Sequence, residues 1–383
     1  MTATLRLALF TLLLAPSFSH AGLKTGSEDN AVFGGLPYPI EAALTAGQKL
    51  GVVGFETPYS LTPAAEYDTV LLQGEMSDPA LRVEIAVKGR SFFSAASVYA
   101  PSSSRRFSNG RFWARFSVPL TRQPFKLRVV NLGAADGAKL SFYEAEMTVE
   151  SLSREAPPPP AEKPYIPDPS LSLPYSAPFK MIRRAEWKAE LPKSSYTLHQ
   201  PFYFTLHHTQ GNYPKTPEAA ISEIQFVQDY HQNAKKWIDI GYHFMVDPFG
   251  NIYEGRPIRV EGAHVLSRNT GNIGISIMGN YHPPVSNPVT PASAGSFVTI
   301  GRYLKDTYAV NVSSFYAHRD IGNSDCPGDD LYARKAELRD LIFTPQPAPL
   351  PVNLSDAPPL TPAQQQSLTR LKTYLLSIEA SPQ

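Results

Sequence analysis

Cysteine, long apolar runs and an excess of charge of either sign are all scarce in this sequence. Cys326 is the only cysteine among 383 residues, so no disulfide can form within the chain. Beyond the amino-terminal segment, no apolar run is long enough to predict a membrane span. The formal net charge of +1 provides no general attraction for a polyanion, which argues against nucleic acid as a partner.

The first residues of the chain have the pattern of a secretory signal. Arg6 precedes an apolar stretch from Leu7 to Ala15, and Ser19-His20-Ala21 resembles a cleavage site. Cleavage there would remove Arg6 and no acidic residue, which leaves a net charge of zero. We therefore expect residues 1–21 to be a signal peptide and the mature protein to be exported. A single cysteine in an exported protein is either a reactive thiol or a metal ligand.

Residues 22–156 have the alternation that is typical of short antiparallel strands. Apolar and polar residues alternate from Leu81 to Val87 and from Arg111 to Val118, and similar segments follow. Turn residues such as Ser108-Asn109-Gly110 separate these segments. Several short strands at this spacing predict an all-β domain of the sandwich type, without a catalytic site of its own.

Proline-rich segments indicate the next domain boundaries. Residues 157–178 contain nine prolines in twenty-two positions, a composition that favours extended geometry and predicts a semi-rigid linker. A second proline-rich stretch begins at Pro345. With an amphipathic helix that would start at Thr361-Pro362, it fills residues 345–383.

Residues 179–344, between the two proline-rich segments, alternate predicted strands and helices. Thr216-Pro217 and Thr290-Pro291 have the pattern of helix starts, because threonine caps the first turn and proline suits its first position. Strand patterns lie around them, one of them at Gly241 to Val246. This order predicts an α/β fold with a central mixed sheet flanked by helices.

Two histidines and the lone cysteine of this region offer ligands for a metal. His207 and His208 end an apolar run, and His318 precedes Cys326 by eight residues. Neighbouring strand residues point to opposite faces, so His207 and His208 cannot both face one metal. His208 shares its face with the apolar residues, and we assign it to the core. Zinc accepts two imidazoles and one thiolate, and three protein ligands leave its fourth position open, as in hydrolytic sites. The pattern therefore favours a zinc hydrolase that uses His207, His318 and Cys326.

Motifs across residues 182–332 resemble those of a known family. They are Arg184-Ala185-Glu186-Trp187, Leu206-His207-His208-Thr209, Asp239-Ile240-Gly241-Tyr242-His243-Phe244, Gly250-Asn251-Ile252-Tyr253-Glu254-Gly255-Arg256, Gly262-Ala263-His264, Asn272-Ile273-Gly274-Ile275-Ser276, His318-Arg319 and Cys326-Pro327-Gly328. In this order they are similar to the zinc amidase domain that peptidoglycan recognition proteins share with phage-type N-acetylmuramoyl-L-alanine amidases. The resemblance implies a central sheet flanked by helices and Zn²⁺ held by His207, His318 and Cys326. It also implies hydrolysis of the amide bond between N-acetylmuramic acid and L-alanine in the stem peptide of peptidoglycan.

The same resemblance implies roles for four further residues. Tyr242, in its Gly-Tyr context, matches a residue that assists the reaction through its hydroxyl. Ser324 stands where similar enzymes carry threonine or lysine, and it keeps a hydrogen-bond donor without the charge. His264 and Asn269 match positions that line the groove for the muramyl stem peptide.

Two departures from the family's pattern bear on the origin of the protein and on its stem-peptide preference. The animal members' cysteine pair after the histidine motif is missing, which favours a bacterial protein exported to the periplasm or the cell exterior. Pro257-Ile258 stands where recognition proteins often have Gly-Trp, so no stem-peptide preference follows from the resemblance.

Two other classes of function stay open. A non-catalytic peptidoglycan-recognition protein would keep the fold and lose a metal ligand, whereas Cys326 is present here. A cysteine peptidase would use Cys326 as nucleophile with a histidine base. Against it, Pro327 follows the cysteine, and the spacing from His318 suits two ligands better than a nucleophile and its base.

Overall fold

The computed structural model describes residues 29–44, 49–91, 94–150 and 165–345, together with residues 361, 365, 366 and 369. The predicted signal peptide lies outside these residues. The apolar residues of the predicted carboxyl-terminal helix also lie outside them. Of that predicted helix, only Gln365, Gln366 and Thr369 are described as helical. The described residues up to Phe343 form one compact unit, and the chain divides from it at Thr344. Among the described residues, no helix is long and apolar enough to cross a membrane.

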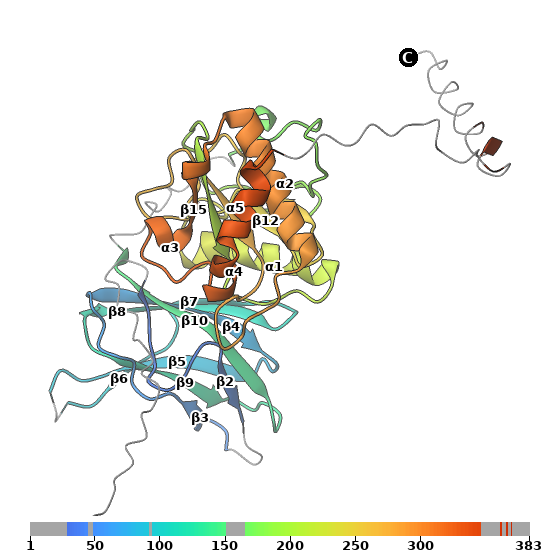
Figure 1. Ribbon diagram of the computed structural model, residues 1–383. Helices are drawn as coiled ribbons and strands as arrows, with labels where there is room; N and C mark the ends of the chain where they lie inside the picture. The colour runs from blue at the N-terminus through green and yellow to red at the C-terminus, as the bar shows by residue number, and fades with distance from the viewer. Residues whose placement is uncertain are drawn as a thin grey trace, which may run out of the picture. The chain divides into compact units, whose positions relative to one another are not determined.

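The described residues before the linker form two antiparallel sheets packed face to face (Figure 1). One sheet has the strand order β1-β10-β4-β8-β7, with β2 also paired to β10, and the other has the order β3-β9-β5-β6. The strands are β1 Asp29–Asn30, β2 Ile40–Ala43, β3 Val53–Glu56, β4 Tyr67–Met76, β5 Leu81–Val87, β6 Ser97–Tyr99, β7 Ser103–Arg106, β8 Arg111–Thr121, β9 Phe125–Asn131 and β10 Lys139–Thr148. Alternate residues such as Phe116, Phe125 and Phe142 fill the core between the sheets. The predicted all-β sandwich is confirmed.

A five-stranded mixed sheet forms the centre of the second region. Its order is β13-β12-β14-β11-β15, in which β11 is parallel to both neighbours and only β13 is antiparallel to its partner. The strands are β11 Tyr203–His208, β12 Phe244–Val246, β13 Ile252–Glu254, β14 Asn272–Ile277 and β15 Phe315–Ala317. Every residue of β12, β13 and β14 is buried, as expected for a sheet covered on both faces.

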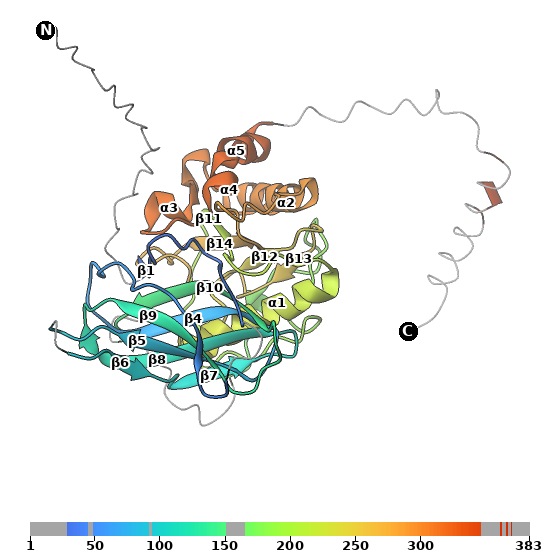
Figure 2. The same cartoon turned by 90° about the horizontal axis from the view of Figure 1, so that it is seen from below.

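Helices cover both faces of this sheet, which confirms the predicted α/β fold. The helices are α1 Pro217–Asp229, α2 Pro291–Tyr308, α3 His318–Ile321, α4 Asp329–Ala333 and α5 Lys335–Phe343, with a π-helix at Tyr230–Ala234 and 3₁₀ turns at Pro169–Leu171 and Val312–Ser314. The predicted caps are confirmed, because Thr216 Oγ1 accepts from the Ala219 N–H and Thr290 Oγ1 accepts from the Ser293 N–H. Helices α2 and α5 lie on the face away from the sandwich, and α1 lies on the other face (Figure 2).

Helix α1 also packs against the outer face of the sandwich. A hydrophobic cluster joins Leu71 of β4 and Trp113 of β8 to Phe226 of α1. Beside it, Arg111 of β8 forms a two-pronged ion pair with Glu223, with both N–O distances at 3.0 Å and both side chains 1% exposed. The sequence predicted a spacer between the two regions, but their surfaces are joined by a buried interface. Alternation identified the polar face of β8 but could not show what covers it.

The described end of the predicted linker is held against the α/β region. Leu173 is buried in the core beneath the mixed sheet. Its carbonyl oxygen accepts from Arg183 Nη1 at 2.7 Å, and the Ile182 N–H donates to the carbonyl oxygen of Ile252 in β13. Residues 165–178 therefore pack against the α/β region and do not form a spacer in solvent.

Candidate functional site

The structure brings together the three predicted metal ligands at one edge of the mixed sheet. His207 lies near the end of β11, His318 begins α3 directly after β15, and Cys326 precedes α4. Because β11 and β15 are parallel neighbours, their carboxyl ends meet at the same edge. One ligand atom from each residue lies within 4.8 Å of the others, and all three side chains are buried. Two imidazoles and one thiol this close together could hold a metal ion.

A chain of hydrogen bonds determines which nitrogen of His207 can bind a metal. His264 Nε2 lies 3.2 Å from the Asn272 carbonyl oxygen, which can only accept, so this nitrogen carries the proton. His264 Nδ1 is then an acceptor, and it lies 3.0 Å from His207 Nε2, which must donate. The lone pair of His207 is therefore on Nδ1, and Nδ1 lies 3.5 Å from Cys326 Sγ. Outer hydrogen bonds of this kind orient metal-binding histidines.

Cys326 lies in surroundings that suit a metal ligand. Burial raises the pKa of its thiol to about 12, although the N–H of His208, 3.3 Å from Sγ, acts in the opposite direction. A thiol with so high a pKa is protonated near neutral pH unless a cation displaces the proton, as a coordinated metal does. Two imidazoles and a buried thiol fit the preferences of zinc.

His208 points away from this group, as the strand alternation predicted. Its Nδ1 accepts from the Tyr281 N–H at 3.3 Å, and its ring lies at a tilt to the Tyr281 ring. Burial lowers the pKa of His208 to about 3, so the ring is neutral. It is a hydrogen-bonded core residue.

Two glycines leave room for the histidine rings. A Cβ on Gly322 would come within 2.8 Å of His318 Nε2, and a Cβ on Gly274 would come within 2.7 Å of the His264 ring. Buried rings cannot move aside without displacing their partners. Glycine at position 274 of the Asn-Ile-Gly-Ile-Ser motif therefore leaves room for the His264 ring, which contacts His207.

Tyr242 lies beside the metal group on the loop before β12. Its ring centroid is 5.3 Å from that of His207 and 5.7 Å from that of His231. The preceding Gly241 accepts no larger side chain, since a Cβ there would lie 2.2 Å from the Ala263 carbonyl oxygen. The backbone N–H of Gly241 donates to His231 Nδ1 at 3.0 Å. Both contacts hold the loop that carries Tyr242.

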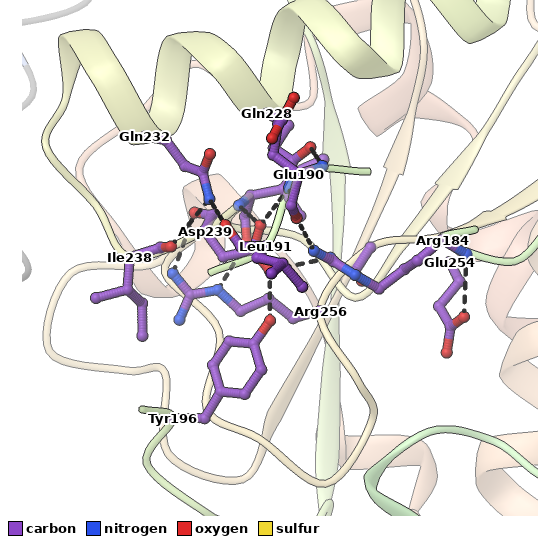
Figure 3. A network of polar contacts seen from close by, with 12 residues as sticks. Arg184, Glu190, Leu191, Tyr196, Gln228, Gln232, Ile238, Asp239, Glu254 and Arg256 are labelled. Carbon is purple, nitrogen blue, oxygen red and sulfur yellow. Dashed lines mark hydrogen bonds and ion pairs between the residues drawn. The ribbon is translucent and has the colours of Figure 1, made fainter. Parts of the chain in front are cut away.

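A buried polar network anchors the start of the same loop (Figure 3). Asp239 is fully buried, and its carboxylate lies 2.9 Å from Arg184 Nη1 and accepts from Gln228 Nε2 at 2.7 Å. The Tyr196 hydroxyl donates to the same carboxylate. Arg256 Nε donates to the Ile240 carbonyl oxygen at 2.6 Å. Arg184 and Arg256, which come from two sequence motifs, therefore hold Asp239 and Ile240, the residues that lead to Tyr242.

Ser324 and Asn269 shape the loops around the site. Ser324 lines the cavity beside the metal group, and its Oγ accepts from the Cys326 N–H at 3.1 Å. Asn269 Oδ1 accepts from the N–H groups of His264 and Val265, both at 2.9 Å. The roles predicted for Ser324 in the reaction, and for His264 and Asn269 in substrate binding, stay predictions.

The cavity beside the metal group has a volume of about 110 Å³ and a second wall, which the sequence did not reveal. Tyr242, His318 and Cys326 line one side. Gln73 and Glu144, from strands of the sandwich, line the other. The only signal in the sequence was that these polar residues alternate with core residues, which also describes an ordinary solvent-exposed face.

Comparison with known proteins identifies the family to which the α/β region is related. Residues 197–329 match the family model described as N-acetylmuramoyl-L-alanine amidase. Peptidoglycan-recognition protein SC2 of Drosophila melanogaster is 36% identical over 158 residues, which are 40% of this chain and 82% of that protein. Peptidoglycan recognition protein 1 of Bos taurus is 37% identical over 159 residues, which are 40% and 80% of the two chains. The solved structure of wild-type PGRP-LB of Drosophila aligns with 40% of this chain and 91% of its own, at 26% identity and a TM-score of 0.35. The chain therefore belongs to the family of N-acetylmuramoyl-L-alanine amidases and peptidoglycan-recognition proteins.

Proposed function

We propose that this protein is a zinc-dependent N-acetylmuramoyl-L-alanine amidase, which hydrolyses the amide bond between N-acetylmuramic acid and L-alanine in peptidoglycan. The observation that carries the proposal is the complete group of His207, His318 and Cys326, with ligand atoms within 4.8 Å of one another. A recognition protein without activity has no need of such a group. The predicted signal peptide supports export of the enzyme to the periplasm or the cell exterior.

The residues of the site have distinct tasks in this reaction. When bound, zinc supplies a Lewis acid for the amide carbonyl and lowers the pKa of a water molecule to about 7. His264 fixes His207 in the tautomer that presents Nδ1. Tyr242 is close enough to the group for its hydroxyl to donate a hydrogen bond to the oxyanion that develops on the carbonyl oxygen. Ser324 holds the Cys326 backbone.

A cysteine peptidase is less well supported by the same geometry. Burial raises the pKa of Cys326 to about 12, whereas a nucleophilic cysteine requires a lowered pKa. His207 Nδ1 is near the thiol, but its partner nitrogen faces His264, which is neutral in the tautomer given by its own hydrogen bonds. The residue that orients His207 through Nε2 is thus an imidazole.

Mass spectrometry of digested peptidoglycan tests the proposal. Incubation of purified sacculi and of soluble muropeptides with the full-length mature protein should release free peptides that begin with L-alanine. A chelator should abolish the release, and added zinc should restore it. Cleavage within the peptide, insensitive to chelators, would identify a peptidase, and binding without any product would identify a recognition protein.

A further inference from the structure

The wall that the sandwich contributes to the cavity is acidic. Glu144 and Glu146 on β10 project from the outer face of their sheet, because Ala145 and Met147 point into the sandwich core. A register shift in β10 just before Glu144 places it opposite Gln73 of β4. Both carboxylates thus face the cavity that is also lined by His318 and Cys326, two of the three predicted metal ligands.

The charge of this wall is only partly balanced. Glu146 forms an ion pair with Lys235, which follows the π-helix. Glu144 Oε2 accepts from Gln73 Nε2 at 2.8 Å, and among the described residues it forms no ion pair of its own, although Lys235 is near enough to act on its pKa in the lowering direction. Burial, and next the neighbouring Glu146, raise the pKa of Glu144. A carboxylate in this position would be stabilised by a positive charge in the cavity.

A buried hydroxyl lies at the same place. The side chain of Tyr230, in the π-helix after α1, is 3% exposed and lines the cavity. Its hydroxyl has no hydrogen-bond partner among the described residues. Tyr230, Glu144 and Glu146 line the same cavity, and both carboxylates add to the rise that burial causes in the pKa of the phenol. An unsatisfied buried hydroxyl costs stability, and a ligand group would satisfy it.

We propose that Glu144, Gln73 and Tyr230 form a subsite that binds the primary ammonium group of an amino-acid side chain in the stem peptide of the substrate. The proposal rests on the proposed function and adds to it the chemical class of substrate side chain that the sandwich selects. An ammonium group has three hydrogens to donate, and Glu144 and the Tyr230 hydroxyl offer acceptors. Gln73 orients the carboxylate through its amide.

The subsite and the metal group share one cavity. Glu144 and Tyr230 line the cavity together with His318 and Cys326. One substrate molecule in a single cavity can therefore meet both walls. Selectivity for an ammonium group distinguishes this role from a purely structural one, since an interface carboxylate would affect all substrates alike.

Two synthetic muramyl tripeptides test the proposal directly. One ends in L-lysine, and the other ends in L-lysine acetylated on its side-chain amine. The full-length mature protein should cleave the first with a kcat/KM that is roughly tenfold to a hundredfold higher, the range expected for one charge-assisted hydrogen bond. Glu144→Gln should bring the ratio close to one, and Tyr230→Phe should lower it by a smaller factor.

Glu41→Gln is the matched control. Glu41 is an exposed glutamate of the same sheet, on β2, and its carboxylate accepts from Ser141 Oγ at 2.6 Å. This variant should keep the preference of the wild type. Zinc content and thermal unfolding of each variant separate misfolding from loss of selectivity.

Equal ratios in the wild type and Glu144→Gln, or no preference in the wild type, would overturn the subsite. If the wild type cleaves neither tripeptide, the proposed hydrolysis fails, and calorimetric binding of the same two compounds decides the subsite alone. Tighter binding of the free amine that Glu144→Gln abolishes would then support it, and equal binding would reject it.

Discussion

The two walls of the cavity are built by different means. In the wall from the α/β region, His207, His264 and Cys326 are fixed by hydrogen bonds to one another and to the backbone. In the wall from the sandwich, Glu144 lies on the outer face of a sheet whose inner face forms the core. The first wall carries the family motifs, and the second has none of them. The comparison suggests that reaction chemistry and substrate choice are divided between the two regions.

The largest effect should come from the metal group itself. Cys326→Ser removes the only thiolate, and serine is a much weaker zinc ligand, so we expect loss of zinc and of activity together. Elemental analysis and product release on muropeptides measure both. A thiol alkylator should act slowly on the zinc-loaded wild type and quickly after metal removal, because a coordinated thiolate is a poor nucleophile. Activity that survives thorough removal of zinc would falsify the mechanism.

The joint between the two walls should be nearly as sensitive. Arg111→Met leaves Glu223 buried without its partner, and breaking such a pair costs about 3–5 kcal/mol in the free energy of unfolding. Arg339→Met is the control, since Arg339 pairs with Asp340 at the surface of α5, where both side chains are exposed, and exposed pairs contribute about 0–1 kcal/mol. Urea unfolding of both variants measures the difference. Similar losses in the two variants would contradict a structural joint at Arg111.

Tyr242→Phe should separate reaction chemistry from metal binding in the first wall. The variant loses only a hydroxyl that can donate to the transition state, so zinc content should be unchanged and kcat should fall roughly tenfold to a thousandfold. Tyr303→Phe removes a hydroxyl from α2, on the far side of the sheet, and should leave kcat unaltered. Unchanged turnover in Tyr242→Phe would make Tyr242 a packing residue and turn attention to Ser324.

The first wall could be predicted from the sequence because its determinants are local. Thr216 and Thr290 cap their helices through contacts three residues away, and strand alternation separated His207 from His208. That His207, His318 and Cys326 would come together could be predicted from the order of the family motifs. Their spacing in the sequence alone does not show it. The tautomer of His207 depends on His264, which is 57 residues away, so it could be assigned only from the structure.

The second wall could not be predicted for a physical reason. Arg111 and Trp113 alternate with core residues exactly as solvent-facing side chains do, and only α1 of a distant segment buries them. A tryptophan on an otherwise polar face was the one local sign of a covered surface. Glu144 depends on a register shift in β10, which no alternation pattern reveals. The domain boundaries drawn at the proline-rich segments stay predictions.

The smallest effect should come from the outer hydrogen bond within the first wall. His264→Ala removes the acceptor for His207 Nε2, and loss of such a partner typically lowers metal affinity roughly tenfold to a hundredfold. His264→Gln should recover part of the affinity, because its amide can accept from His207 and donate to the Asn272 carbonyl oxygen. Zinc titration against a chromophoric chelator measures both, with His282→Ala as a control for loss of a histidine that is 40% exposed. If His264→Ala binds zinc as tightly as His282→Ala, the hydrogen bond does not orient His207. A graded series from wild type through His264→Gln to His264→Ala would instead show that the geometry of this hydrogen bond tunes the affinity for zinc.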